Sequence, residues 1–261
     1  MRLIDIGVNL TNKRLSVDLE GILERAAAVG VNQLIVTGTS LEHSRMAIAQ
    51  CERFPDQLFC TCGIHPHDAK EWNAETRAEL ESMISHPSVR AIGETGLDFN
   101  RDFSPRETQI EVFRQQLELA ASSQKPLFLH QRDAFDTFYS LLKEYRGQLG
   151  DIVAHCFTDD KDSLFALLEL NCHIGITGWI CDERRGRELQ ALVKYIPPDR
   201  LMLETDAPYL LPRDLPQKPS SKTNLPEYLP HILQTVARLQ GKSIPLLADE
   251  VLTTTQRFFR I

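Results

Sequence analysis

Several histidines and acids in this sequence stand at or directly after apolar, strand-like runs. Those that can do metal or acid–base chemistry are His65, Glu94, His130, His155 and Asp206. Nitrogen and carboxylate donors together suit Zn²⁺, Mn²⁺ or Fe²⁺, whereas Mg²⁺ prefers oxygen ligands and keeps its waters. An ion held by Glu94, His130 and His155 would keep open positions, at which water becomes more acidic and a phosphoryl oxygen is polarised. Asp206 would then act as a general base, or as a ligand of a second ion.

The stretch GIHPHD, residues 63–68, places two histidines one residue apart. On an extended chain, residues i and i+2 point to the same side, so His65 and His67 could hold one ion between them. Pro66 cannot donate to a sheet ladder, which predicts that the strand ends at His65 and that the two rings diverge. We therefore expect His65 to contact phosphate or water beside the ion, and His67 to make a weaker contact.

The elements that must position these residues alternate along the chain. Apolar runs predict strands at 3–8, 33–38, 58–64, 89–94, 126–130, 151–155, 173–177 and 200–205. Amphipathic runs predict helices at 16–29, 40–53, 74–85, 105–122, 133–146, 160–170, 184–194, 226–240 and 244–259. Eight strand–helix units in 261 residues predict an α/β fold, the (β/α)8 TIM barrel, with an additional C-terminal helix. We expect a single domain, residues 1–261.

The barrel would bring the candidate residues together, because its chemistry sits at the carboxyl ends of the strands. A doubly wound open sheet is the alternative fold, although no G-x-G-x-x-G follows a predicted strand. The stretch 207–225 is rich in proline and polar residues and too long for a plain turn, so we expect a functional loop. Arg213 in that loop is a candidate phosphate contact. Asp98 and Asp133 follow ligand-bearing strands and could orient the metal-bound groups.

Composition narrows the function classes. A formal net charge of −7 argues against a protein that coats nucleic acid through a basic surface, but not against an enzyme with a locally basic pocket. The six cysteines are expected to be reduced, since none forms a C-x-x-C pair and no secretory signal is apparent. No stretch approaches the roughly 18 apolar residues of a membrane span. We expect a cytoplasmic monomer without a membrane partner.

A resemblance to a known family rests on six motifs in order. They are GIHPHD, GETGLDF (93–99), LHQRDA (129–134), AHCFT (154–158), ITGW (176–179) and ETDAPYLLP (204–212). The chain resembles the TatD family of metal-dependent deoxyribonucleases across essentially its whole length. The resemblance implies a TIM barrel related to the amidohydrolases, and a 3′→5′ exonuclease acting on single-stranded DNA and RNA, with a role in DNA repair or nucleic-acid turnover. It places the metal ligands on Glu94, His130 and His155, and the catalytic aspartate on Asp206.

The first strand departs from that family pattern, which has D-x-H-x-H there. This chain has Asp5, Gly7 and Asn9 at the corresponding positions. Gly7 cannot ligate, and Asn9 offers only a neutral amide oxygen. We therefore expect one firmly bound divalent ion and a second, weaker one that is recruited with substrate phosphate. Magnesium is the expected cofactor, with Mn²⁺ or Zn²⁺ as alternatives.

The same residues are also compatible with other functions. A metal-dependent hydrolase of an amide or an aminoacyl ester would use the same barrel and ion, because fold does not determine function. A binding protein with a degraded site is a third possibility, given the missing strand-1 histidines. Phe99 and Trp179 stand beside strand ends and could stack unpaired bases, which favours a single-stranded substrate.

Overall fold

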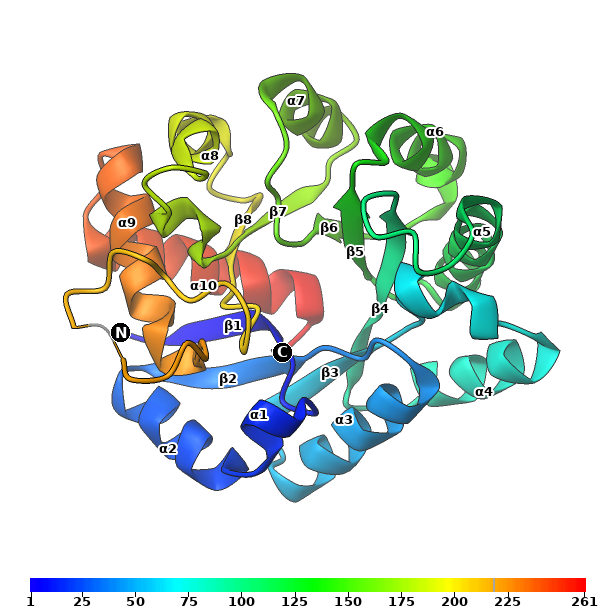
Figure 1. The fold of residues 1–261 in the computed structure, drawn as a ribbon, viewed down its shortest axis with the longest axis horizontal. Coiled ribbons are helices and arrows are strands. Elements are labelled where there is room, and N and C mark those ends of the chain that lie inside the picture. Colours follow the sequence, from blue (N-terminus) through cyan, green and yellow to red (C-terminus); the bar gives the residue numbers. More distant parts are fainter. Residues whose placement is uncertain (218) are drawn as a thin grey trace. The chain divides into compact units, whose positions relative to one another are not determined.

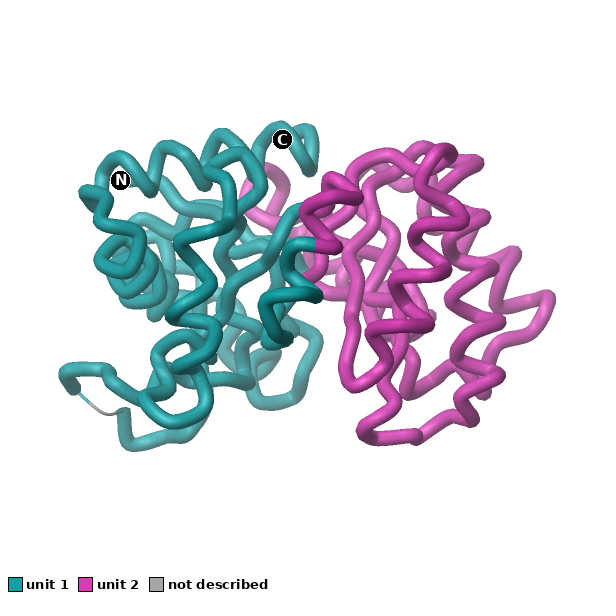
Figure 2. Tube along the Cα trace, turned by 90° about the horizontal axis from the view of Figure 1, so that it is seen from above, with its two compact units in different colours: residues 1–36, 156–165, 173–261 teal, residues 37–155, 166–172 magenta. Residues whose placement is uncertain are grey.

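The computed structural model describes residues 1–217 and 219–261. The chain forms two compact units, shown in different colours in Figure 2. Unit 1 comprises residues 1–36, 156–165 and 173–261, and unit 2 comprises residues 37–155 and 166–172. The expected single domain stays a prediction.

Unit 2 contains four parallel strands in sequence order. They are β3 (Leu58–Cys62), β4 (Val89–Asp98), β5 (Leu127–Arg132) and β6 (Ile152–Ala154), and each pairs with the next. The helices that follow strands are α4 (Ala74–Ile84), α5 (Arg106–Ser123) and α6 (Phe135–Tyr145), and α3 (Leu41–Arg53) precedes β3 (Figure 1). The rings of Phe113 and Phe138 stack 5.4 Å apart, which joins α5 to α6.

Unit 1 contains the other four strands, which are β1 (Leu3–Val8), β2 (Val31–Val36), β7 (His173–Ile176) and β8 (Leu201–Leu203). Strand β1 pairs with β2, β7 pairs with β8, and a parallel bridge joins Val8 to Ala207 just after β8. The helices assigned to this unit are α1 (Lys13–Ser16), α2 (Leu19–Ala28), α8 (Arg187–Leu192), α9 (Leu229–Gln240) and α10 (Ile244–Phe259). Helix α7 (Lys161–Glu169) connects β6 to β7 in sequence.

The strands consist almost entirely of buried residues, as expected for a parallel sheet covered on both faces. Helix starts follow local capping chemistry, because Ser40, Asn73 and Ser243 accept hydrogen bonds from the first turns of α3, α4 and α10. Along the described residues, eight strands alternate with helices, which confirms the predicted (β/α)8 fold class. Helix α10 is the predicted additional C-terminal helix.

Most strand ends differ from the sequence prediction by one or two residues, and two of the differences lie beside the candidate site. Strand β3 ends at Cys62 rather than His65. At Gly63 the backbone of Gly93 approaches so closely that an added Cβ would lie 2.7 Å from it. Strand β4 continues to Asp98 rather than ending at Glu94, because the register with β5 extends through Asp98 and Arg132.

All six cysteines are free thiols, as predicted. Among the described residues, no helix combines the length and apolar character needed to cross a membrane. Residue 218 of the predicted functional loop lies outside the described residues.

Candidate metal centre

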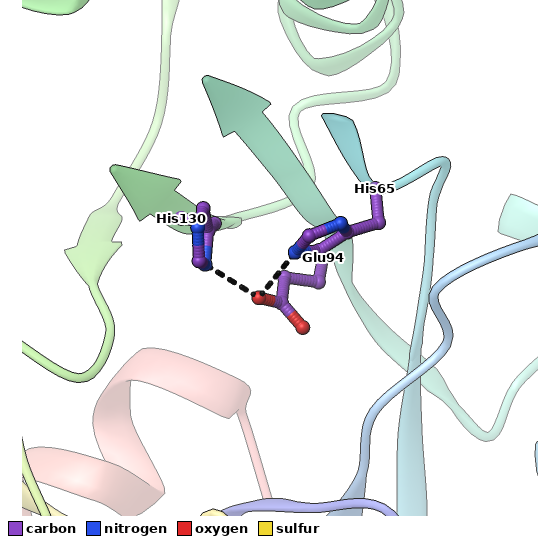
Figure 3. Close-up of side chains that lie close together, drawn as sticks. All are labelled: His65, Glu94 and His130. Carbon is purple, nitrogen blue, oxygen red and sulfur yellow. Dashed lines mark ion pairs between the residues drawn. The ribbon is translucent and has the colours of Figure 1, made fainter. Parts of the chain in front are cut away.

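Glu94 is the centre of a cluster of imidazoles in unit 2. Its Oε1 atom lies 3.0 Å from Nδ1 of His130, 2.9 Å from Nε2 of His155 and 3.3 Å from Nε2 of His65. Figure 3 shows His65 and His130 converging on this carboxylate oxygen. The side chains of this cluster are almost wholly removed from solvent, except that His130 is 20% exposed. A carboxylate surrounded by imidazole nitrogens suits a divalent transition metal.

Each member of the cluster comes from the carboxyl-terminal part of a strand or from the segment after it. Glu94 lies in β4, His130 lies in β5, and His155 directly follows β6. His65 precedes the 3-10 helix η1 (Pro66–Glu71) and caps its first turn. In a parallel sheet the carboxyl ends of neighbouring strands meet at one edge, so residues far apart in sequence converge there.

Gly96 allows β5 to lie close beside β4 next to the cluster. It pairs with His130 in the strand register and has a φ of +140°. A Cβ atom at this position would lie 1.9 Å from the carbonyl oxygen of His130. Only glycine fits this conformation and this approach, so the position of His130 depends on it.

Gln116 of α5 fastens the backbone beside His65 to β4. Its side chain is fully buried, and its Nε2 donates to Oγ1 of Thr95 at 2.6 Å and to the carbonyl of Ile64 at 3.0 Å. Its Oε1 accepts from the Ile64 amide at 2.9 Å. The sequence reasoning missed Gln116, because a glutamine within an amphipathic helix carries no signal that it is buried.

Asp98 lies beside the rings that border the cluster. Its Oδ2 atom lies 2.7 Å from Nε2 of His67 and 3.5 Å from Nε2 of His130. Its Oδ1 atom accepts from the amides of Asn100 and Arg101. Asp98 therefore contacts two of the rings beside Glu94, and its orienting role stays a prediction. Asp133, the other residue predicted to orient the metal-bound groups, accepts a hydrogen bond from the side chain of Asn100 at 2.6 Å.

The electrostatics of the cluster favour an ionised carboxylate. Burial opposes ionisation of Glu94, but the charges of His155 and His65 and the hydrogen bonds of the histidines outweigh it. The pKa of Glu94 is therefore held well below its usual range. Burial lowers the pKa of His65 to about 4 despite the attraction of Glu94. Burial also acts to lower the pKa of His130, but hydrogen bonds to Asp98 and Glu94 outweigh it and raise that pKa.

The donor set fits a divalent ion. Nε2 of His130 is buried, and among the described residues its nearest carboxylate, Oδ2 of Asp98, is 3.5 Å away and forms no well-aligned hydrogen bond with it. Nε2 of His65 faces the Glu94 carboxylate at 3.3 Å, and its Nδ1 accepts from the His67 amide at 3.1 Å. Ligand atoms of His65, Glu94 and His130 lie within 4.8 Å of one another.

The structure separates the two histidines of GIHPHD by role. His65 contributes to the cluster around Glu94, whereas the ring of His67 turns to Asp98. Their ring centroids are 4.2 Å apart in an edge-on arrangement. The prediction that the rings diverge after the strand agrees with these contacts. His65 lies 3.3 Å from the carboxylate oxygen, against 3.0 and 2.9 Å for the predicted ligands His130 and His155, so the ligand set stays a prediction.

Asp206 and Asn9 form a pair within unit 1. Asp206 follows β8 with a φ of +54°, and its Oδ1 atom accepts from Nδ2 of Asn9 at 3.0 Å. The Asn9 amide nitrogen also donates to the carbonyl of Ala207, and the Asp206 amide donates to the carbonyl of Gly7. Asn9 thus positions the predicted catalytic carboxylate, a role the sequence reasoning did not assign to it.

Arg213 lies among acids of unit 1. Its Nε atom is 3.6 Å from Oδ2 of Asp182 and 3.8 Å from Oε2 of Glu183, and its side chain is 45% exposed. Asp182 also pairs with Arg185 at 2.9 Å. The charge of Arg213 is therefore partly offset, while its exposed side chain stays open to a ligand. Its substrate role stays a prediction.

A (β/α)8 fold that places a buried carboxylate among imidazole donors defines a metal-dependent hydrolase of the barrel type. The family of TatD related DNases matches residues 4–260. The chain is 47% identical over 259 residues to the "3'-5' ssDNA/RNA exonuclease TatD" of Pectobacterium parmentieri, covering 99% of this chain and 100% of the relative. It is 46% identical over 259 residues to the protein of the same name from Escherichia fergusonii, covering 99% of each.

Solved structures of TatD proteins are also similar to this chain in fold. A TatD homologue from Escherichia coli K12 superposes with a TM-score of 0.90 at 26% identity, covering 100% of this chain and 98% of that one. A TatD family hydrolase from Entamoeba histolytica gives a TM-score of 0.90 at 26% identity, covering 99% and 98%. This chain belongs to the TatD related DNase family.

Proposed function

We propose that this protein is a divalent-metal-dependent 3′→5′ exonuclease that hydrolyses phosphodiester bonds in single-stranded DNA and RNA. The observation that carries the proposal is the convergence of three imidazoles on the ionised carboxylate of Glu94. The names of relatives that share nearly half of its residues support the choice of substrate and polarity. We further propose a cytoplasmic role in DNA repair or nucleic-acid turnover.

Glu94, His130 and His155 would hold the ion, which supplies Lewis acidity toward a phosphoryl oxygen and toward water. This nitrogen-rich donor set favours Mn²⁺ or Zn²⁺ at the tight site. Mg²⁺ would instead enter with the oxygen ligands of the substrate phosphate. Calorimetric titration should find one tight equivalent that Glu94→Gln removes, and two equally tight equivalents that this variant removes would contradict the assignment.

Asp206 would accept the proton of the attacking water. Its carboxylate is held by Asn9 and remains partly exposed, so it can meet both water and substrate. A hydrogen bond from a neutral amide leaves a carboxylate ionised and able to take a proton. Removing the amide should therefore affect the positioning of the base and spare the ion bound at Glu94.

Substrate contacts would come from His65, His67 and Arg213. The ring of His67 lies 4.7 Å from the ring of Phe103, whose side chain is 57% exposed. An exposed aromatic ring next to a polar cluster offers a stacking surface for an unpaired base. Phe99 and Trp179, predicted for this role, lie under the guanidinium groups of Arg106 and Arg185 at 4.7 and 4.3 Å.

The test uses single-stranded DNA and RNA oligonucleotides labelled at either end. The wild type should shorten 5′-labelled strands stepwise and release labelled mononucleotide at once from 3′-labelled strands, in Mn²⁺ or Mg²⁺ but not in chelator. Glu94→Gln should reduce the rate by at least about tenfold, since even outer-shell partners of a metal contribute that much. Glu118→Gln changes an exposed glutamate of α5 and is the matched control. Activity that persists in chelator, or in Glu94→Gln at the control rate, would refute the proposal.

A further inference from the structure

Unit 1 contains a second group of metal-type donors. Cys181 ends the 3-10 helix η3 (Gly178–Cys181), Asp214 lies in the loop after β8, and His231 lies in the first turn of α9. One ligand atom from each of them lies within 4.8 Å of the other two. Nε2 of His231 is 2.6 Å from Oδ1 of Asp214. Three segments of the chain therefore meet at a thiol, a carboxylate and an imidazole.

We propose that Cys181, Asp214 and His231 form a second metal site, which binds Zn²⁺ and ties the loop after β8 to η3 and α9. A thiolate, an imidazole and a carboxylate are all established zinc ligands, and three of them leave one position for water. The negative charges of the thiolate and the carboxylate would balance the charge of the ion. The site is independent of the proposed nuclease function.

Burial and exposure suit a site that an ion can reach. The thiol of Cys181 is buried, whereas the side chains of His231 and Asp214 are 18% and 43% exposed. The ion would enter from the side of Asp214 and reach the thiol last. The buried sulfur would be a fixed ligand, and the two partly exposed side chains would leave the site accessible to an ion from solvent.

Binding releases the proton of the Cys181 thiol. Burial, together with the charge of Asp214, raises the pKa of the Cys181 thiol to about 12, so the group is protonated before an ion arrives. The S–H bond breaks, a sulfur–metal bond forms and the proton passes to solvent. Nε2 of His231, which faces Oδ1 of Asp214, would ligate in the ring form that carries its proton on Nδ1.

The competing interpretation is a metal-free hydrogen-bonded group. In it Asp214 pairs only with His231, and Sγ of Cys181 donates to Oγ1 of Thr235 at 3.5 Å. That arrangement uses the thiol weakly and leaves it outside the ion pair. A divalent ion would engage all three donors, and the two interpretations differ in whether sulfur contacts a metal.

The test is a Co²⁺ titration of the chelator-treated full chain, followed by thiolate-to-cobalt charge-transfer absorption. The band reports a thiolate ligand, which the donors around Glu94 cannot supply, and the loss of the band in Cys181→Ser assigns it to this site. One equivalent should saturate it, and one equivalent of Zn²⁺ should abolish it. Cys181→Ser should remove the band, and Asp214→Asn should weaken Co²⁺ binding at least about tenfold. Cys51→Ala, which removes a buried thiol of α3, should leave the band unchanged.

Two results would overturn the proposal. One is the absence of a charge-transfer band from the wild type at any Co²⁺ concentration up to precipitation. The other is a band that is unchanged in Cys181→Ser or in Asp214→Asn. Circular dichroism confirms that each variant is folded. Asp214→Asn decides the matter if Cys181→Ser does not fold, because the Asp214 side chain is largely at the surface.

Discussion

Asp5 is a buried acid of β1 whose titration should be visible in the stability of the whole protein. It is fully buried, and its carboxylate accepts from the amide and hydroxyl of Thr205 and from the Gly7 amide. Burial outweighs these hydrogen bonds and, with the charge of Glu204, raises the pKa of Asp5 from 3.8 to about 7. The folded protein therefore keeps the Asp5 proton to a higher pH than the unfolded chain does.

The sign and size of the effect follow from proton linkage. Between pH 4 and pH 7 the folded state binds more protons at Asp5 than the unfolded state, so stability contributed by this group falls as pH rises. The contribution is complete below the unfolded pKa and is lost as pH passes through the folded pKa. Three pKa units correspond to about 4 kcal/mol, since one unit is worth about 1.4 kcal/mol.

The perturbation is Asp5→Asn, which keeps the shape and removes the charge. Urea unfolding followed by circular dichroism, at pH 4 to pH 8, gives the free energy of unfolding of the variant relative to the wild type. That difference should shift by about 4 kcal/mol in favour of the variant as pH rises. Any pH-independent cost of the amide cancels in this comparison. Asp249→Asn, an exposed change in α10, is the control and should show no such shift.

The reasoning would be refuted if the difference in free energy of unfolding between Asp5→Asn and the wild type stayed constant from pH 4 to pH 8. A shift of the opposite sign would refute it as well, because it would mean that the hydrogen bonds from Thr205 and Gly7 outweigh the cost of burial. In either case the carboxylate of Asp5 would be ionised throughout this range in the folded protein.

Three further changes probe the metal centre and the base. Gly96→Ala should lower the free energy of unfolding by about 1–3 kcal/mol through backbone strain, as measured by urea unfolding. It should also weaken metal binding, as measured by calorimetry, and an unchanged metal affinity would mean that His130 is not a ligand. His65→Ala should retain metal binding and lose turnover, and lost binding would make His65 a ligand. Asn9→Ala should lower kcat about tenfold with intact metal affinity, and an unchanged kcat would remove Asp206 as the positioned base.

Much of the architecture was predictable because it depends on local patterns. Apolar runs and amphipathic periods gave strands and helices within a few residues of their observed bounds, as in α10, which was predicted at 244–259 and spans Ile244–Phe259. The sequence also indicated that Glu94 and His130 lie in the carboxyl-terminal halves of their strands and that His155 directly follows a strand. Parallel strands separated by helices must present their carboxyl ends together, so the order of residues along the chain predicts a cluster.

Contacts between distant segments were decided only by the tertiary structure. Cys181, Asp214 and His231 carry no motif, and only the packing of η3, α9 and the loop after β8 brings them together. Asp5 and Thr205 are 200 residues apart, and the packing that brings them together buries the Asp5 carboxyl, which raises its pKa despite the hydrogen bonds from Thr205. A sequence records which groups are present and their local periodicity. Burial and through-space neighbours set the pKa values and the partners, and those depend on how the whole chain packs.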